Sequence, residues 1–129
     1  MSRTRRCTPA TVEGRLRKAR MFRDAASNVM DLAADEQDVL DACITLWVHA
    51  GIAAADVLCC KRLGEHAQGD NHNEAVGLLA RVDGDRAKDL SVLLTLKTPA
   101  SYGAGRSSAD DGKRARRAAD RLVDAATNA

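Results

Sequence analysis

A nearly unbroken apolar segment between Asp41 and Lys61 constrains the fold of this chain more than any other feature. Its only polar side chains are those of Thr45, His49 and Asp56. At about 100° per residue in a helix, Thr45 and His49 lie about 40° apart and Asp56 falls about 20° back, so the three share one face. An unpaired buried hydroxyl or carboxylate costs about 1–3 kcal/mol or more. We therefore predict a central core helix that carries a connected polar seam.

Length and composition predict a single all-α domain. The chain has 129 residues and only 2% aromatic residues, so Ala, Leu, Val, Ile and Met must build the core. Most of these residues favour helix, and small alanines let helices approach closely. We predict an antiparallel four- or five-helix bundle over residues 9–129, preceded by a basic tail over residues 1–8. Trp47 should be buried in its core.

Five segments carry helix start and stop signals. Ser, Asn and Asp precede several apolar stripes of 3.6-residue period, and Gly or Pro follows most of them. No strand pattern competes, and only the first several residues and 125–129 are expected to fray. The helices should run from Pro9 or Thr11 to about Val29, from Asp35 to about Gly64, from Asn71 to about Asp83, from Asp85 to about Pro99 and from Ser108 to about Ala126.

The apolar segment and the N-terminus predict a cytoplasmic protein that does not span a membrane. Because His49 and Asp56 interrupt it, its apolar run is expected to be shorter than the roughly 18 residues that cross a bilayer. The basic start, residues 1–6, leads into a charged helix and not into an apolar signal region. Neither feature indicates export or insertion.

The four cysteines predict reduced thiols that act as small apolar residues. Cys7 lies in the basic tail, and Cys43, Cys59 and Cys60 lie along the apolar helix. Adjacent Cys59 and Cys60 point in different directions on a helix and cannot easily bridge each other. No spacing defines a metal site, and no Gly-rich phosphate loop is present, so no metal or cofactor is expected.

Charge is distributed unevenly along the chain. Eight basic residues and only Glu13 precede Asp24, whereas residues 24–60 contain seven acids and no Lys or Arg. If the first and last helices are neighbours, their basic strips could contact phosphate groups of RNA. The alternative is that they pair with acidic segments, within one chain or across a dimer. The second strip consists of Lys113, Arg114, Arg116, Arg117 and Arg121.

Several motifs resemble those of small, single-domain HEPN proteins of actinobacterial type, over nearly the whole chain after the basic tail. The resemblance implies a helical bundle, usually dimeric, in a superfamily that contains metal-independent endoribonucleases of toxin-antitoxin and phage-defence systems beside non-catalytic members. The motifs are His49-Ala-Gly-Ile-Ala-Ala-Ala-Asp56-Val-Leu, Gly69-Asp-Asn-His72-Asn-Glu74-Ala-Val-Gly-Leu-Leu79, Leu96-Lys97-Thr-Pro-Ala-Ser-Tyr102, Ser107-Ser-Ala-Asp-Asp111 and Arg117-Ala-Ala-Asp-Arg121-Leu-Val.

The catalytic signature of active HEPN ribonucleases is Arg, four to six residues, then His, and this chain departs from it. Arg62 and His66 have three residues between them, and Arg62 and His72 have nine. Four residues separate Lys61 from His66, which is the right spacing, but the signature requires Arg and not Lys at the first position. We therefore expect a non-catalytic binding or assembly module, with a metal-independent endoribonuclease as the alternative.

Ribonuclease chemistry nevertheless has candidate residues. It needs a base, an acid and a cation, roles that His and Arg can fill near neutral pH. Arg62, His66 and His72 are the candidate catalytic residues, and their convergence on an open groove would favour the enzyme. Phosphate contacts are expected from Lys97, Tyr102 and Arg106, if the fourth helix returns beside them.

A homodimer is the expected assembly, and another protein or RNA is a possible further partner. The central helix is apolar nearly all round, more than a small bundle readily covers. For the polar seam, the structural interpretation is a satisfied network in which Asp56 is ionised and held by Arg62 or by a basic side chain of another helix. The competing interpretation makes the seam functional.

Overall fold

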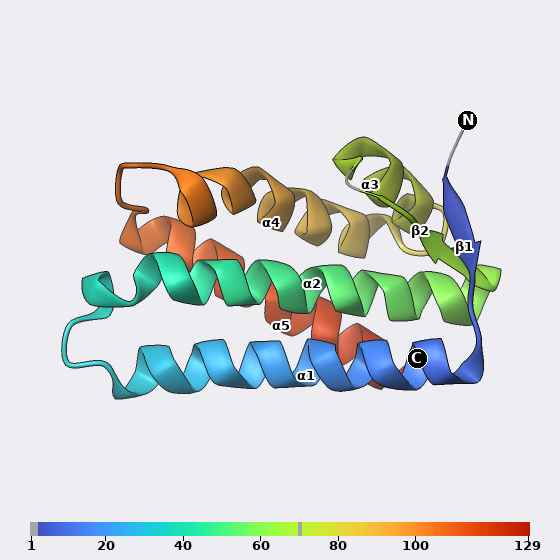
Figure 1. The fold of residues 1–129 in the computed structure, drawn as a ribbon, viewed down its shortest axis with the longest axis horizontal. Coiled ribbons are helices and arrows are strands. Elements are labelled where there is room, and N and C mark those ends of the chain that lie inside the picture. Colours follow the sequence, from blue (N-terminus) through green and yellow to red (C-terminus); the bar gives the residue numbers. More distant parts are fainter. Residues whose placement is uncertain (1–2, 70) are drawn as a thin grey trace.

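Five α-helices form most of the protein in a computed structural model that describes residues 3–69 and 71–129 (Figure 1). Met1, Ser2 and Asp70 lie outside the described residues. The predicted all-α fold class is confirmed, whereas the HEPN-like identity of the bundle stays a prediction. The elements are β1 (Thr4–Arg6), α1 (Pro9–Leu32), the 3-10 turn η1 (Glu36–Asp38), α2 (Leu40–Leu63), β2 (Glu65–Ala67), α3 (His72–Ala80), α4 (Gly84–Tyr102) and α5 (Ala109–Thr127).

Helix α2 is the centre of the bundle. It packs against α1, α4, α5 and β2, and its apolar side chains are buried by these elements of the same chain. Trp47 is 1% exposed, which confirms its predicted burial. Gly51 lets the Leu93 side chain of α4 pack directly against the α2 backbone, because a Cβ there would collide with it. Helix α2 is thus covered within one chain. Its apolar surface, which was the reason to expect a dimer, therefore does not require a second copy.

Helix α2 is long and apolar enough to cross a membrane by length and composition alone, so the prediction that the run is too short was wrong. The helix has 24 residues, and 72% of its most apolar window is buried inside the bundle. That burial is typical of the core helix of a folded domain. This helix therefore does not indicate the cellular compartment of the protein.

Helix boundaries follow the predicted caps at three of the five helices. Thr8 caps α1 in a reciprocal arrangement with Thr11, and Asn71 and Ser108 cap α3 and α5. Helix α2 begins five residues later than predicted, at Leu40, because Asp35 caps the η1 turn instead. In α4, the cap is Asp83, two residues before the predicted Asp85.

Helix α4 also continues past its predicted stop at Pro99 and ends at Tyr102. A proline within the last turn removes only one backbone hydrogen bond, so the helix can continue through it. The backbone N–H of Gly103 then donates to the Pro99 carbonyl at 3.1 Å and closes the helix. The extra turn carries Ser101 against α2, where its hydroxyl lies 3.0 Å from that of Thr45.

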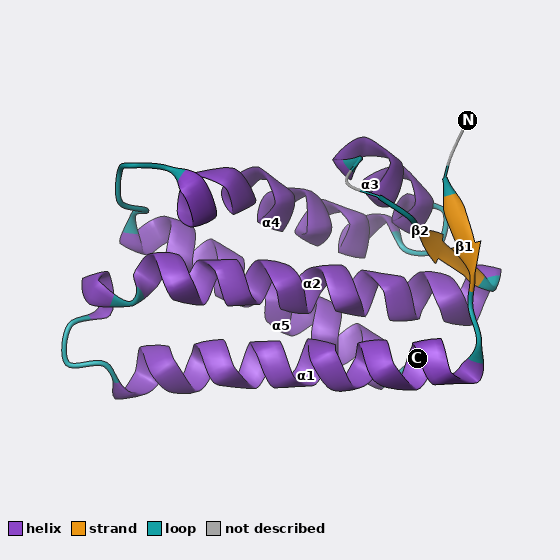
Figure 2. Cartoon of the chain, viewed as in Figure 1, coloured by secondary structure: helices purple, strands orange, loops and turns teal. Residues whose placement is uncertain are grey.

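Two short strands contradict the prediction that no strand forms and that the first residues fray (Figure 2). Strand β1 pairs antiparallel with β2, with Arg5 opposite His66. The backbone N–H of Gln68 donates to the Arg3 carbonyl at 3.0 Å and extends the ladder. A three-residue strand has too few positions to show an alternating pattern, and its pairing partner lies about 60 residues away, so no local pattern predicts it.

A disulfide between Cys7 and Cys60 contradicts the prediction that all four thiols are reduced. The β1–β2 pairing brings the tail beside the end of α2, where the two Cα atoms are 5.7 Å apart. Cys43 and Cys59 are free and buried, as expected of small apolar residues. Because one pair is oxidised, cysteine usage no longer supports the predicted cytoplasmic location.

Candidate ligand-binding pocket

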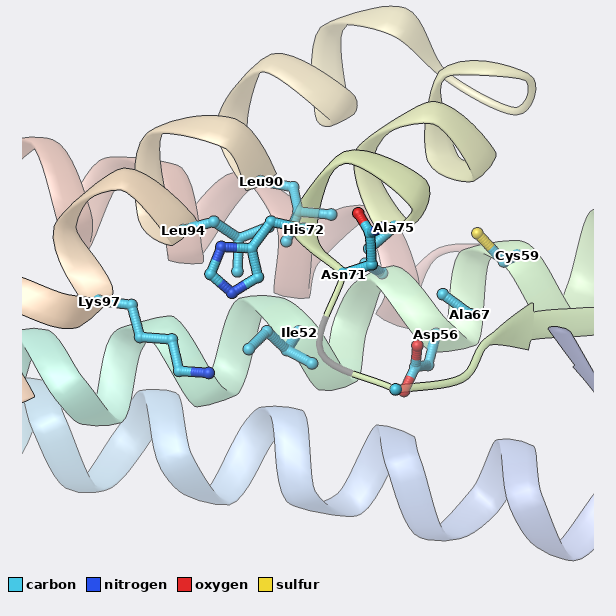
Figure 3. A pocket seen from close by; sticks show the side chains of 12 residues that line it. Ile52, Asp56, Cys59, Ala67, Asn71, His72, Ala75, Leu90, Leu94 and Lys97 are labelled. Carbon is cyan, nitrogen blue, oxygen red and sulfur yellow. The ribbon is translucent and has the colours of Figure 1, made fainter. Parts of the chain in front are cut away.

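A cavity of about 110 Å³ lies between α2, the segment from β2 to α3, and α4 (Figure 3). One residue from each predicted group lines it: Asp56 from the polar seam, His72 from the candidate catalytic residues and Lys97 from the candidate phosphate contacts. Most of the remaining wall is apolar, and the full lining is Ile52, Ala55, Asp56, Cys59, Ala67, Gly69, Asn71, His72, Ala75, Leu90, Leu94 and Lys97.

Three elements position the polar groups of this cavity. Asn71 caps α3, accepting at its Oδ1 from the backbone N–H of Glu74 at 3.1 Å, and this fixes the first turn that carries His72. Lys97 extends from α4 and Asp56 from α2. In Figure 3 the His72 ring and the Lys97 side chain lie near each other beside Ile52, while Asp56 lies further along α2. The arrangement provides a cationic side and an acidic side, with an apolar floor between them.

Asp56 lies in a poorly solvated position, since its side chain is 13% exposed. Burial raises the pKa of its carboxyl to about 6, against the opposing effects of His66 and Arg15. The Oδ1 atom lies 3.9 Å from Nδ1 of His66, and Oδ2 lies 3.6 Å from Nε of Arg15. The nearest cation is thus a basic side chain of another helix, α1. Both distances exceed those of a strong ion pair, which explains why burial has the larger effect.

His66 and Arg62 do not join His72 at the cavity. His66 is 6% exposed on β2, and its Nδ1 lies 2.9 Å from the carbonyl oxygen of Ala67, as expected for a ring with its hydrogen on Nδ1. Arg62 is exposed near the C-terminal end of α2. Of the three candidate catalytic residues, only His72 lines the cavity, so the predicted convergence is not present in one chain.

The polar seam is not a connected network among the described residues. The Thr45 hydroxyl donates to the Asp41 carbonyl at 2.9 Å and meets Ser101 of α4. His49 is exposed, with its ring 5.8 Å from that of Phe22 on α1. No described hydrogen bond joins Thr45, His49 and Asp56. They share a face as predicted, but α2 has different neighbours along its length. Thr45 meets α4, whereas His49 and Asp56 meet α1 at different turns, and Asp56 also lies near His66 of β2.

The predicted phosphate contacts also separate. Only Lys97 lines the cavity, whereas Tyr102 is 79% exposed at the end of α4. Arg106 borders another cavity, near Gly103 and Asp111. Five residues along a helix correspond to about 140° of rotation, which directs Tyr102 away from Lys97.

The basic strips of α1 and α5 are partly neutralised within the chain. The two helices are neighbours, and Arg116 of α5 makes a bidentate pair with Asp31 of α1 at 2.8 and 3.0 Å. Arg23 of α1 approaches Asp120 and Asp124 of α5 at 3.8 and 3.4 Å. These pairs match the predicted alternative of pairing with acidic segments, and they hold α1 against α5.

Sequence reasoning missed Arg15, Asn71 and Cys59 as neighbours of the site. Asn71 was recognisable as a helix cap. A cap next to a histidine at a helix start is a local signal that indicates a polar site there. Arg15 reaches Asp56 from a helix distant in sequence, which no local pattern predicts. Burial raises the pKa of the Cys59 thiol to about 12, so Cys59 contributes an apolar wall and not a nucleophile. Among the described residues, no group of three or more side chains is arranged to hold a metal ion.

No protein-family model matches this chain, and a search of curated proteins finds no similar sequence. The resemblance to HEPN proteins therefore stays a prediction that rests on the quoted motifs.

Proposed function

We propose that this protein is a homodimeric, non-catalytic helical binding and assembly module of HEPN type, whose cavity between α2, α3 and α4 binds a small acidic molecule. The observation that supports the proposal is that His72 and Lys97, from different helices, line one largely apolar cavity. A cation and an imidazole beside apolar walls suit a ligand with a carboxylate or phosphate group and a short apolar body.

The size of the cavity favours a small ligand over RNA. Pockets for drug-sized molecules have volumes of roughly 300–1,000 Å³. A volume of about 110 Å³ leaves room for a few non-hydrogen atoms and not for two nucleosides joined by a phosphodiester. The occupant should therefore be close to acetate or inorganic phosphate in size.

A metal-independent endoribonuclease is the second candidate, and one observation favours it. The cavity unites His72, Asp56 and Lys97, which could serve as base, acid and phosphorane-stabilising cation. A carboxyl with a pKa of about 6 can carry a proton near neutral pH. The spacing departure at Arg62 and the small cavity make binding the better supported function.

Titration with inorganic phosphate and with acetate tests the binding proposal, using the His72 ring proton resonances as the readout. We expect a saturable shift in the wild type, at least a tenfold weaker response in Lys97→Gln, and an unchanged response in the matched control Lys88→Gln, which is exposed on the same helix. Equal responses in both variants would reject the cavity as the site.

An RNA-cleavage assay with metal chelated tests the second candidate, run with Arg62→Ala and His72→Ala. We expect no cleavage by the wild type. Cleavage that His72→Ala abolishes would overturn the non-catalytic proposal and favour the enzyme. Cleavage that only Arg62→Ala abolishes would instead place catalysis outside the cavity.

A further inference from the structure

Three arginines of α5 line an open surface cavity between α4 and α5, which shares no lining residue with the ligand cavity described above. They follow one another at intervals of three and four residues, so at about 100° per residue they lie within about 60° of one another around the helix. The cavity has a volume of about 160 Å³. Its lining is Asp89, Val92, Arg114, Arg117, Ala118 and Arg121.

Asp89 holds one of these arginines from the buried side of the cavity. Its side chain is only 9% exposed, and its Oδ1 accepts a hydrogen bond from Nη1 of Arg121 at 3.0 Å. The other carboxylate oxygen, Oδ2, lies 2.9 Å from Nε of Arg86 on α4. A guanidinium has five N–H donors, so the half-exposed Arg121 keeps donors for a ligand. The buried carboxylate therefore positions Arg121 and leaves most of its hydrogen-bonding capacity free.

The other two lining arginines are poorly neutralised. Arg117 is exposed and forms no ion pair among the described residues. Nη1 of Arg114 lies 3.6 Å from Asp111, which is longer than a strong ion pair. We define the arginine cluster as the three lining arginines, Arg86, and the carboxylate partners Asp89 and Asp111. Four guanidiniums face two carboxylates, so the cluster carries two uncompensated positive charges.

We infer that the arginine cluster binds the phosphate monoester group of a small molecule. A phosphate monoester carries close to two negative charges near neutral pH and presents three strong acceptor oxygens. This charge matches the two uncompensated positive charges of the cluster. Three guanidiniums around one cavity can each donate to a different oxygen of a tetrahedral group. A carboxylate, with one charge and two oxygens, would leave part of the cluster unused.

RNA is a poorer match to the same cluster. Each phosphodiester carries a single charge, and single-stranded RNA gains much of its affinity from bases that stack on aromatic side chains. No aromatic side chain lines this cavity. The inferred site depends neither on the homodimer nor on the ligand cavity of the proposed function.

Titration with phenyl phosphate tests the site, with phenyl sulfate as a probe of the same shape and a single charge. Calorimetry at low salt and about pH 7.5 should show about tenfold tighter binding of phenyl phosphate. Arg117→Gln should weaken that binding about tenfold, whereas Arg20→Gln, which removes an exposed arginine of α1, should leave it unchanged. Equal affinity for the two probes, equal effects of the two variants, or no binding would overturn the inference.

Two competing explanations are tested in the same assay. Lys97→Gln should leave the affinity for phenyl phosphate unchanged, because Lys97 lines only the ligand cavity. A loss of affinity in this variant would assign the probe to the ligand cavity and reject the arginine cluster. An RNA oligonucleotide without terminal phosphates should not displace phenyl phosphate. Displacement at equal phosphate concentration would contradict a monoester site and favour a phosphodiester surface.

Asp89→Asn tests whether the buried carboxylate positions Arg121. The substitution removes a negative charge beside the site, so charge alone would strengthen the binding of an anion. We expect weaker binding instead, by about fivefold, with unchanged helical circular dichroism, because Arg121 loses its charged partner. Unchanged or tighter binding would refute the positioning role. Arg117→Gln, which breaks no ion pair among the described residues, tests the site itself even if Asp89→Asn does not fold.

Discussion

Replacing Asp56 with asparagine should change how the stability of the protein depends on pH. The buried carboxyl has a pKa of about 6 in the folded chain, against an ordinary value of 3.8. A raised pKa means that the folded chain holds this proton more tightly than the unfolded chain. The associated stability is fully present below about pH 4 and is lost as pH rises through 6. A difference of about two pKa units corresponds to about 3 kcal/mol.

Urea unfolding of the wild type and Asp56→Asn between about pH 4 and pH 7 measures this effect. The variant does not titrate at this position, so its free energy of unfolding should rise relative to the wild type by about 3 kcal/mol across the range. Asp38→Asn, at an exposed position, should differ from the wild type by less than about 0.5 kcal/mol at every pH. A wild type that gains stability relative to Asp56→Asn as pH rises would refute the reasoning, because a carboxylate held by a strong ion pair has a lowered pKa.

Two further predictions concern packing and the disulfide. Gly51→Ala should lower the free energy of unfolding by about 1–3 kcal/mol in denaturant melts, because its Cβ would collide with Leu93, while Gly77→Ala in α3, with open space around it, should be neutral or slightly stabilising. A Gly51→Ala protein as stable as the wild type would show that the Leu93 side chain or α4 can move aside without cost. Cys7→Ser should cost about 2–4 kcal/mol, because the bridge closes a loop with a sequence separation of 53. Reductant should lower the wild type to the level of the variant and leave the variant unchanged, and a reductant effect on Cys7→Ser would contradict this explanation.

The sequence determined where most helices begin and which of them forms the core. Thr8, Asn71 and Ser108 act as caps because a side-chain oxygen that accepts from a nearby backbone N–H is a local interaction. The burial of Trp47 followed from its place in the apolar run. The same local reasoning was wrong at Pro99, since a proline near the end of a helix costs only one hydrogen bond.

The tertiary structure decided which side chains meet. The Cys7–Cys60 bridge, the approach of Arg15 to Asp56, and the shared cavity of His72 and Lys97 join segments that are distant along the chain. Periodicity places a residue on a face of its own helix, but it does not specify which neighbour covers that face at each turn. Thr45, His49 and Asp56 therefore share the predicted face but form no common network, because Thr45 packs against α4 and the other two against separate turns of α1.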